Sequence, residues 1–216
     1  MAQRPVGRHT GAADGRPTAQ PSSDRRLARG QRNRTSIVDA TVELINAGNR
    51  RPTHREVATR AGLAVRTVYN HFGDTDALFC GAAQQQLWRQ RDVVVPIPAH
   101  GPIGSRIRVT CHQRRQLFEE TGPVVRAAHT RTDGSKRFKE LMTQHDVWLR
   151  DLLSATLGPE IEALGDQAEA RFDMLAVATG WEQWNAMRGS YGRSANDAER
   201  LMAHAVGRIL AQGNER

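Results

Sequence analysis

The residues of this chain best suited to chemistry are Arg66, Asn70 and their polar neighbours within one short helical stretch. Arg66 can donate two parallel hydrogen bonds to a guanine edge, and Asn70 can pair in a similar way with an adenine edge. The hydroxyls of Thr67 and Tyr69 suit phosphate oxygens, which position a protein on DNA without reading its sequence. These residue types predict binding to double-stranded DNA.

The segment that must position these residues has the pattern of two short helices separated by a tight turn. Thr53, with Glu56 three residues later, predicts a capping box at the start of the first helix, and Ala61-Gly62-Leu63 predicts the turn. A second helix over 65–72 would then enter the major groove. We expect DNA contacts from both helices and from the start of the next one, at Thr53, His54, Arg55, Val65, Arg66, Thr67, Tyr69, Asn70, His71 and Thr75.

Nearly all of the net charge of +8 lies in the N-terminal third of the chain. Residues 1–75 contain 13 arginines and six acidic residues, whereas the rest contains 18 basic and 17 acidic residues. Such an excess is expected where a polyanion binds; a solvated basic tail without a partner is the alternative. Residues 1–30 are rich in Gly, Pro, Arg and Ser, which predicts a disordered basic arm, either reaching the DNA or free.

Helical periodicity continues along the rest of the chain, with no pattern typical of a buried strand. Two prolines in Val93-Val-Val-Pro-Ile-Pro98 indicate a linker over 93–104. The expected helices, in chain order, cover about 32–47, 74–91, a segment ending near Thr121, a short one after Pro123, 135–157, a separate turn over 159–164, 167–188, and 194–213.

The last two expected helices carry more apolar surface than one neighbouring helix could cover. Pairing of these helices between two copies of the chain would bury that surface in a four-helix bundle. A monomeric core is the alternative. The residues expected at this dimer interface are Met174, Ala178, Trp184, Leu201, Ala205 and Ile209.

Inward-facing residues of the middle helices are the candidates for a small-molecule pocket, although simple core packing explains each of them as well. Their mixture of Trp, Met and Phe indicates an apolar or aromatic ligand. The histidines of this region lack metal-ligand spacing, so neither a metal nor another cofactor is expected. The candidate ligand-binding residues are Phe118, Met142, His145, Trp148 and Trp181.

Cysteine usage and hydropathy indicate where the protein works. Cys80 and Cys111 lie in apolar helical settings, typical of free thiols in a reducing compartment. We find no signal peptide and no run of about 18 apolar residues, so we expect a cytoplasmic protein without a membrane partner. The chain lacks the GxSxG, Walker and HExxH patterns, which leaves a small helical enzyme as a weaker alternative. A non-specific or architectural DNA-binding protein is the other alternative.

A set of motifs follows the amphipathic first helix: Thr53, Val57-Ala58, Ala61-Gly62-Leu63, Thr67-Val68-Tyr69, His71-Phe72, and Asp76 with Leu78. With these motifs, the chain over residues 33–80 resembles the tetracycline-repressor (TetR) family of bacterial transcription regulators. The resemblance implies an all-α homodimer of about nine helices per subunit. It implies a three-helix DNA-binding domain over 31–80, after the arm, and a ligand-binding and dimerisation domain over 81–216. It also implies a repressor in the bacterial cytoplasm, at the nucleoid, that binds a near-palindromic operator and is released by a small-molecule effector.

Two residues depart from the pattern of this family. Thr75 stands where many members have a lysine that holds a phosphate, which should weaken one backbone contact. Ala64 stands where a serine or similar cap is common, which should weaken the helix cap by about 1 kcal/mol.

Overall fold

The computed structural model describes residues 21–132 and 135–211, with side chains from residue 24. Within these ranges every regular element is helical, which confirms the all-α prediction. The elements are α1 (Pro21–Asn46), α2 (His54–Ala61), α3 (Val65–His71), α4 (Thr75–Val93), α5 (Ile103–Arg131), α6 (Lys136–Glu162), the short 3₁₀ helix η1 (Gly165–Gln167), α7 (Ala168–Ala178), α8 (Trp181–Arg188) and α9 (Ala195–Ala211).

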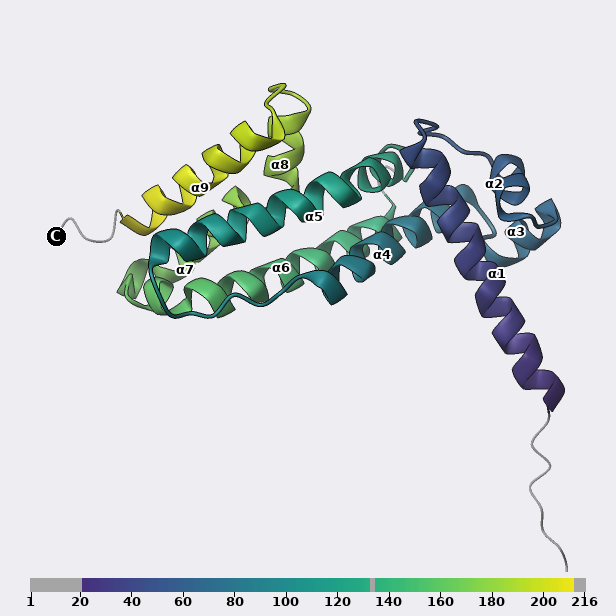
Figure 1. Ribbon diagram of the computed structural model, residues 1–216, viewed down its shortest axis with the longest axis horizontal. Helices are drawn as coiled ribbons and strands as arrows, with labels where there is room; N and C mark the ends of the chain where they lie inside the picture. Colours follow the sequence, from purple (N-terminus) through teal and green to yellow (C-terminus); the bar gives the residue numbers. More distant parts are fainter. Residues whose placement is uncertain (1–20, 133–134, 212–216) are drawn as a thin grey trace, which may run out of the picture.

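The helices form two parts along an elongated molecule (Figure 1). α1, α2 and α3 pack together at one end, and the N-terminal half of α1 projects beyond them. The long helices α5 and α6 extend away from this end, with α4 packed against both. α9 lies along α5 and also packs on α7. None of the described helices is long and apolar enough to cross a membrane.

The small N-terminal bundle is held by apolar side chains that repeat at helical spacing on each of its elements. α1 ends before Gly48, whose φ of 97° reverses the chain toward α2. α4 continues the bundle, since its first apolar residues pack into the same core. The fully buried residues that join these elements are Ile37, Val57, Val68, Phe72, Leu78 and Phe79.

The start of α1 differs from the expectation. The helix begins at Pro21 rather than near residue 32, so the predicted disorder is wrong for residues 21–30. Propagating a helix that is already nucleated adds one hydrogen bond per residue, and Leu, Ala and Arg are good helix formers. The remainder of the predicted arm, residues 1–20, lies outside the described residues.

Three helix boundaries in the C-terminal part also differ. α5 passes through Pro123 and α6 passes through Pro159, where breaks were expected. Buried residues on both sides of Pro123 keep α5 continuous, because tertiary packing outweighs one missing backbone bond. Conversely, the expected helix over 167–188 is divided at Thr179 and Gly180 into α7 and α8. The expected linker is present as an irregular segment over 94–102.

Candidate nucleic-acid interface

The start of α2 is fixed by the predicted capping box. The Thr53 hydroxyl accepts a hydrogen bond from the Glu56 backbone N–H at 3.2 Å. The Glu56 carboxylate accepts one from the Thr53 backbone N–H at 2.7 Å and another from its hydroxyl at 2.7 Å. These bonds, the backbone one first, hold the pKa of Glu56 below its usual value. The pair therefore stabilises the first turn and presents Thr53 at its exposed end.

The turn between α2 and α3 depends on Gly62. Its φ of 67° lies in the left-handed region, which glycine adopts without a steric penalty. Its N–H reaches the carbonyls of Ala58 and Thr59, and the Leu63 N–H donates to Ala58 at 2.9 Å. This arrangement satisfies the end of α2 and redirects the chain into α3 within three residues.

α3 has one face in the core and the other toward solvent. Val68 and the adjoining Phe72 are buried. Arg66, Tyr69 and Asn70 are exposed, as is Val65, whereas Thr67 and His71 are half-buried. Ala64 provides no side-chain hydrogen bond to the start of α3, in agreement with the weakened cap expected from the sequence. The residues expected to read base edges thus lie on the open face of a helix fixed from behind.

His54 takes a different position from the one expected. Its side chain is only 8% exposed, and its ring stacks on Tyr69 with centroids 4.3 Å apart and planes 1° from parallel. Tyr69 itself is 52% exposed. The structure therefore leaves little of the His54 side chain accessible, because Tyr69 covers its ring. His54 instead fixes the direction of the exposed tyrosine ring.

Basic residues surround this face, but two of them have partners within the subunit. Arg55 is exposed on the first turn of α2. Arg60 is paired with Glu43 of α1 at 2.6 Å. The Arg34 guanidinium lies 4.4 Å from the centre of the Phe72 ring, a cation–π contact that ties α1 to the end of α3. Thr75, the first residue of α4, is half-buried.

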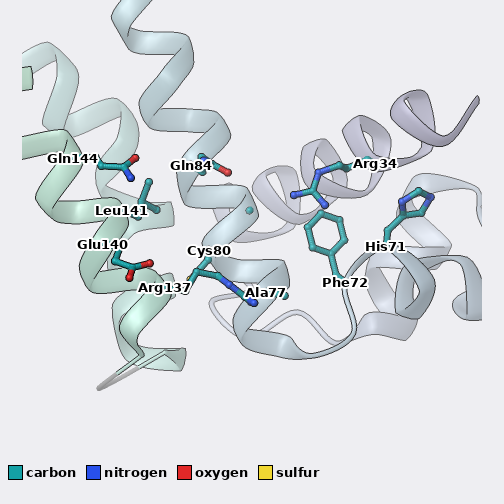
Figure 2. A pocket seen from close by; sticks show the side chains of 11 residues that line it. Arg34, His71, Phe72, Ala77, Cys80, Gln84, Arg137, Glu140, Leu141 and Gln144 are labelled. Atoms are coloured by element: carbon teal, nitrogen blue, oxygen red, sulfur yellow. The ribbon is translucent and has the colours of Figure 1, made fainter. Parts of the chain in front are cut away.

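A cleft of about 410 Å³ separates the N-terminal bundle from α6 (Figure 2). Arg34, His71 and Phe72 line it on one side, and Arg137 and Leu141 of α6 on the other. α6 reaches across the cleft through an ion pair.

That ion pair links the two parts of the molecule. The Arg137 guanidinium lies 3.4 Å from the Asp76 carboxylate at the start of α4 and 4.0 Å from that of Asp74. Asp74 also caps α4, since its carboxylate accepts from the Ala77 N–H at 2.6 Å. The ion pair therefore connects α6 to the start of α4, a few residues after the end of α3.

The candidate ligand residues do not gather around one cavity. Phe118 and Trp181 are buried against each other, with ring centroids 5.8 Å apart. Trp181 lines a cavity of about 390 Å³ between α6, α7 and α8, whereas Phe118, Met142, His145 and Trp148 do not. His145 contacts Trp148 at a centroid distance of 5.4 Å. Sequence reasoning missed Arg91 and Arg114, which lie close to His145, because isolated arginines on long helices carry no motif.

The candidate dimer residues divide into two groups. Met174 and Leu201 are 49% and 48% exposed, and the small residues Ala178 and Ala205 are half-buried. Trp184 and Ile209 are buried within the subunit, which corrects their assignment to an interface.

The buried Trp184 side chain has a hydrogen-bond partner on α5. Its indole N–H donates to the Glu119 carboxylate of α5 at 3.1 Å. The same carboxylate accepts from Arg188, and that bond is the first cause of the lowered pKa of Glu119. Sequence reasoning missed Val177 and Tyr191, whose side chains add exposed apolar surface near Met174 and Leu201.

Comparisons with known proteins agree with this architecture. Residues 37–80 match the family model of bacterial regulatory proteins of the tetR family. A tetR-family transcriptional regulator from Streptomyces coelicolor has a TM-score of 0.64 at 16% identity, over 85% of this chain and 82% of that chain. A transcriptional regulator from Rhodococcus sp. Rha1 has a TM-score of 0.62 at 21% identity, over 85% and 96%. No curated protein matches the chain significantly.

A third similar structure is a multidrug binding protein, EbrR, complexed with imidazole. It has a TM-score of 0.52 at 18% identity, over 80% of this chain and 93% of that chain. At these identities the structural similarities show the fold, and the family model matches only the segment over 37–80, which contains the helix-turn-helix unit.

Proposed function

We propose that this chain is a regulator of the tetR family, a repressor released by a small-molecule effector; the match of residues 37–80 to the family model and the shared fold support this. It binds a near-palindromic operator as a homodimer, in the cytoplasm at the nucleoid. Residues 31–80 form its DNA-binding domain and residues 81–216 its effector and dimerisation domain, with the boundary inside α4.

The observation that carries this proposal is the open polar face of α3. Tyr69 and Asn70 lie three and four residues after Arg66, so the three side chains share one side of the helix. Val68 and Phe72 fix the opposite side in the core. Arg66 and Asn70 are suited to base edges, and Tyr69, held by His54, to a phosphate. A rigid helix with these side chains supports sequence-specific recognition.

The exposed apolar residues of α7 and α9 support a dimer. Met174, Val177 and Leu201 are large apolar side chains facing solvent, and Ala178 and Ala205 lie beside them without obstructing a close approach. A two-fold axis through this face would place two copies of α3 at one DNA duplex. Their symmetry would then match a palindromic site.

α4 is the element suited to couple effector and operator. It starts three residues after α3 and packs along α5 and α6, and its last turn carries the half-buried Arg91. An effector bound beside its C-terminal end would shift its N-terminal end, and with it α3. Release requires that the effector bind the non-operator arrangement more tightly, and the difference in affinity sets the response.

Footprinting of genomic fragments with the full chain tests the proposed DNA recognition. A single protected palindrome is expected. Arg66→Ala should weaken binding by about 1–3 kcal/mol and relax the sequence preference at one base pair. Arg108→Ala, an exposed arginine of α5, is the matched control and should bind like the unmodified protein. Uniform, salt-sensitive binding to all fragments would instead indicate a non-specific DNA-binding protein.

Sedimentation velocity tests the proposed dimer. Leu201→Glu should yield folded monomers, because it places two charges in one apolar interface. Val147→Glu is the matched control, since Val147 is similarly exposed, at 53%, but lies on the polar face of α6. A dimer that survives Leu201→Glu would exclude this interface.

A further inference from the structure

Arg114 of α5 is a buried cation without a carboxylate at ion-pair distance, although the charge of Asp146 acts on it from farther away. Its side chain is 4% exposed, and its Nη2 donates to the Leu149 carbonyl of α6 at 2.6 Å. Its Nε has no hydrogen-bond partner. Over residues 21–132 and 135–211, no carboxylate oxygen lies within 4.0 Å of this guanidinium. Burial lowers the pKa of Arg114 to about 10, yet it stays charged at neutral pH.

Arg106, two turns earlier on the same helix, is a buried arginine whose charge is neutralised by an acid. It is buried to a similar extent and forms an ion pair with Glu160 of α6, besides a bond to the Thr156 carbonyl at 2.7 Å. That pairing raises the pKa of Arg106, with the Glu160 hydrogen bond as its first cause. Both arginines bond to a backbone carbonyl of α6, but only Arg106 has a carboxylate at ion-pair distance among the described residues.

Other unsatisfied donors lie around Arg114. His145 is 1% exposed, and neither of its ring nitrogens has a partner. Burial first, and then the charges of Arg114 and Arg91, lower the pKa of His145 to about 3, so it remains neutral. The Thr110 hydroxyl, one turn before Arg114, and the Nε of Arg91 also lack partners. Several buried polar groups thus lack a hydrogen-bond partner where α4, α5 and α6 meet, and each of them can supply at least one donor.

Apolar groups surround these donors. The Arg91 guanidinium lies 4.0 Å from the centre of the Trp88 ring and 5.1 Å from that of Trp148. Leu117 and Leu152 lie beside Arg114. A buried cation in such surroundings is strongly unfavourable unless an anion with good hydrogen-bond geometry neutralises it. The flat guanidinium suits a carboxylate in particular.

The linker over 94–102 covers this region as a strap. Ile97 of the strap lines a small void with Thr110 and Arg114. The void measures about 20 Å³, room for about one water molecule. Side-chain hydrogen bonds hold the middle of the strap, from Gln113 to the Val95 carbonyl at 2.8 Å and from Thr156 to the Ile97 carbonyl at 3.4 Å, and backbone bonds hold its two ends. The residues of the strap itself are half-buried or exposed, so a ligand that enters here would have to displace little buried surface.

We propose that Arg114, together with Thr110 and His145, binds the carboxylate of a small apolar acid that enters beneath the strap. This inference rests on the proposed function, because the acid would be the effector of the regulator. The position of this anion site would explain how a bound acid changes DNA binding. Arg91 lies at the end of α4, and α6, which carries His145, also carries Arg137 in contact with Asp76 beside α3.

The cavity lined by Trp181 favours the opposite ligand charge. Asp146 and Glu182 line it, and burial, followed by the charge of Glu182, raises the pKa of Asp146. An organic cation would suit that cavity. Probes with one carbon skeleton and three different head groups therefore separate the two sites.

Thermal unfolding of the full chain with phenylacetate, phenylacetamide and phenethylamine tests the proposal. Phenylacetate should raise Tm in a saturable way, and the two other probes should not. Arg114→Met should weaken phenylacetate binding by about tenfold or more, because it removes a charged hydrogen-bond donor. It should also raise the Tm of the ligand-free protein, because a buried unpaired charge disappears. Arg108→Met, exposed on the same helix, is the matched control and should change neither.

Thr110→Val is a second variant that keeps the side-chain volume, and it should weaken phenylacetate binding without loss of folding. Equal Tm shifts with the acid and the amide would overturn the proposal, as would unaltered phenylacetate binding by Arg114→Met. A response to phenethylamine alone, or to none of the three probes, would also overturn it. Operator binding by the ligand-free protein is measured separately, so the anion site can fail while the proposed regulator stands.

Discussion

Gly81 of α4 offers a sharp test of how tightly the recognition helix is fixed. A Cβ added at this position would lie 2.7 Å from the Cε1 atom of Phe72. The ring cannot simply retreat, because it is 2% exposed and has the Arg34 guanidinium 4.4 Å from its centre. Alanine in a helix interior gains about 1 kcal/mol over glycine, but overpacking a rigid core costs about 1–3 kcal/mol. We expect Gly81→Ala to destabilise the protein by about 1 kcal/mol.

Urea denaturation of the two single variants and the double variant measures the steric clash between a Cβ at position 81 and the Phe72 ring. Phe72→Leu removes the ring edge, so Gly81→Ala should become stabilising in that background, by up to about 1 kcal/mol. Gly81→Ala alone should also weaken operator binding, because the displaced Phe72 ends α3. If Gly81→Ala stabilises the protein equally in both backgrounds, the packing of Phe72 against α4 inferred here is incorrect.

Three further predictions concern buried ionisable groups. Since the pKa of His145 is lowered to about 3 from an ordinary 6.5, the unfolded chain alone takes up its proton between these pH values. The free energy of unfolding should therefore fall below about pH 6.5, by up to about 1.4 kcal/mol per pH unit, and His145→Gln should remove this slope in denaturation titrations. Glu160→Gln should cost about 2 kcal/mol by the same assay, because Arg106 loses its counter-charge; an unchanged stability would contradict the pairing. Burial raises the pKa of Cys80 to about 11 and that of Cys111 to about 12, so iodoacetamide at pH 8 should alkylate both thiols only in urea, as mass spectrometry can show.

Residue types within one or two helical turns were sufficient to predict the helix-turn-helix unit. The Thr53–Glu56 capping box and the turn at Gly62 depend on hydrogen bonds between residues three or four positions apart. Such local bonds can be read from spacing alone. The exposed face of α3 was also predicted, because the apolar residues repeat at helical spacing and therefore indicate which side of the helix faces the core.

The C-terminal half was predicted less well, because packing between distant segments decided its details. Pro123 and Pro159 should interrupt helices by local rules, but buried contacts on either side keep α5 and α6 continuous. Trp184 was expected at the surface of a dimer, whereas Glu119, 65 positions earlier, receives its indole N–H inside the subunit. No rule based on neighbouring residues connects those two positions.

By itself, the sequence determined the recognition helix, its cap, its turn and the basic character of the end that carries them, because each depends on interactions close along the chain. Only the tertiary structure decided that His54 lies behind Tyr69, and that Arg106 forms an ion pair with Glu160 while Arg114, among the described residues, forms none. The two arginines look alike in the sequence. Their difference arises because the charge that balances a buried residue comes from a separate helix, whose position is set by the whole fold.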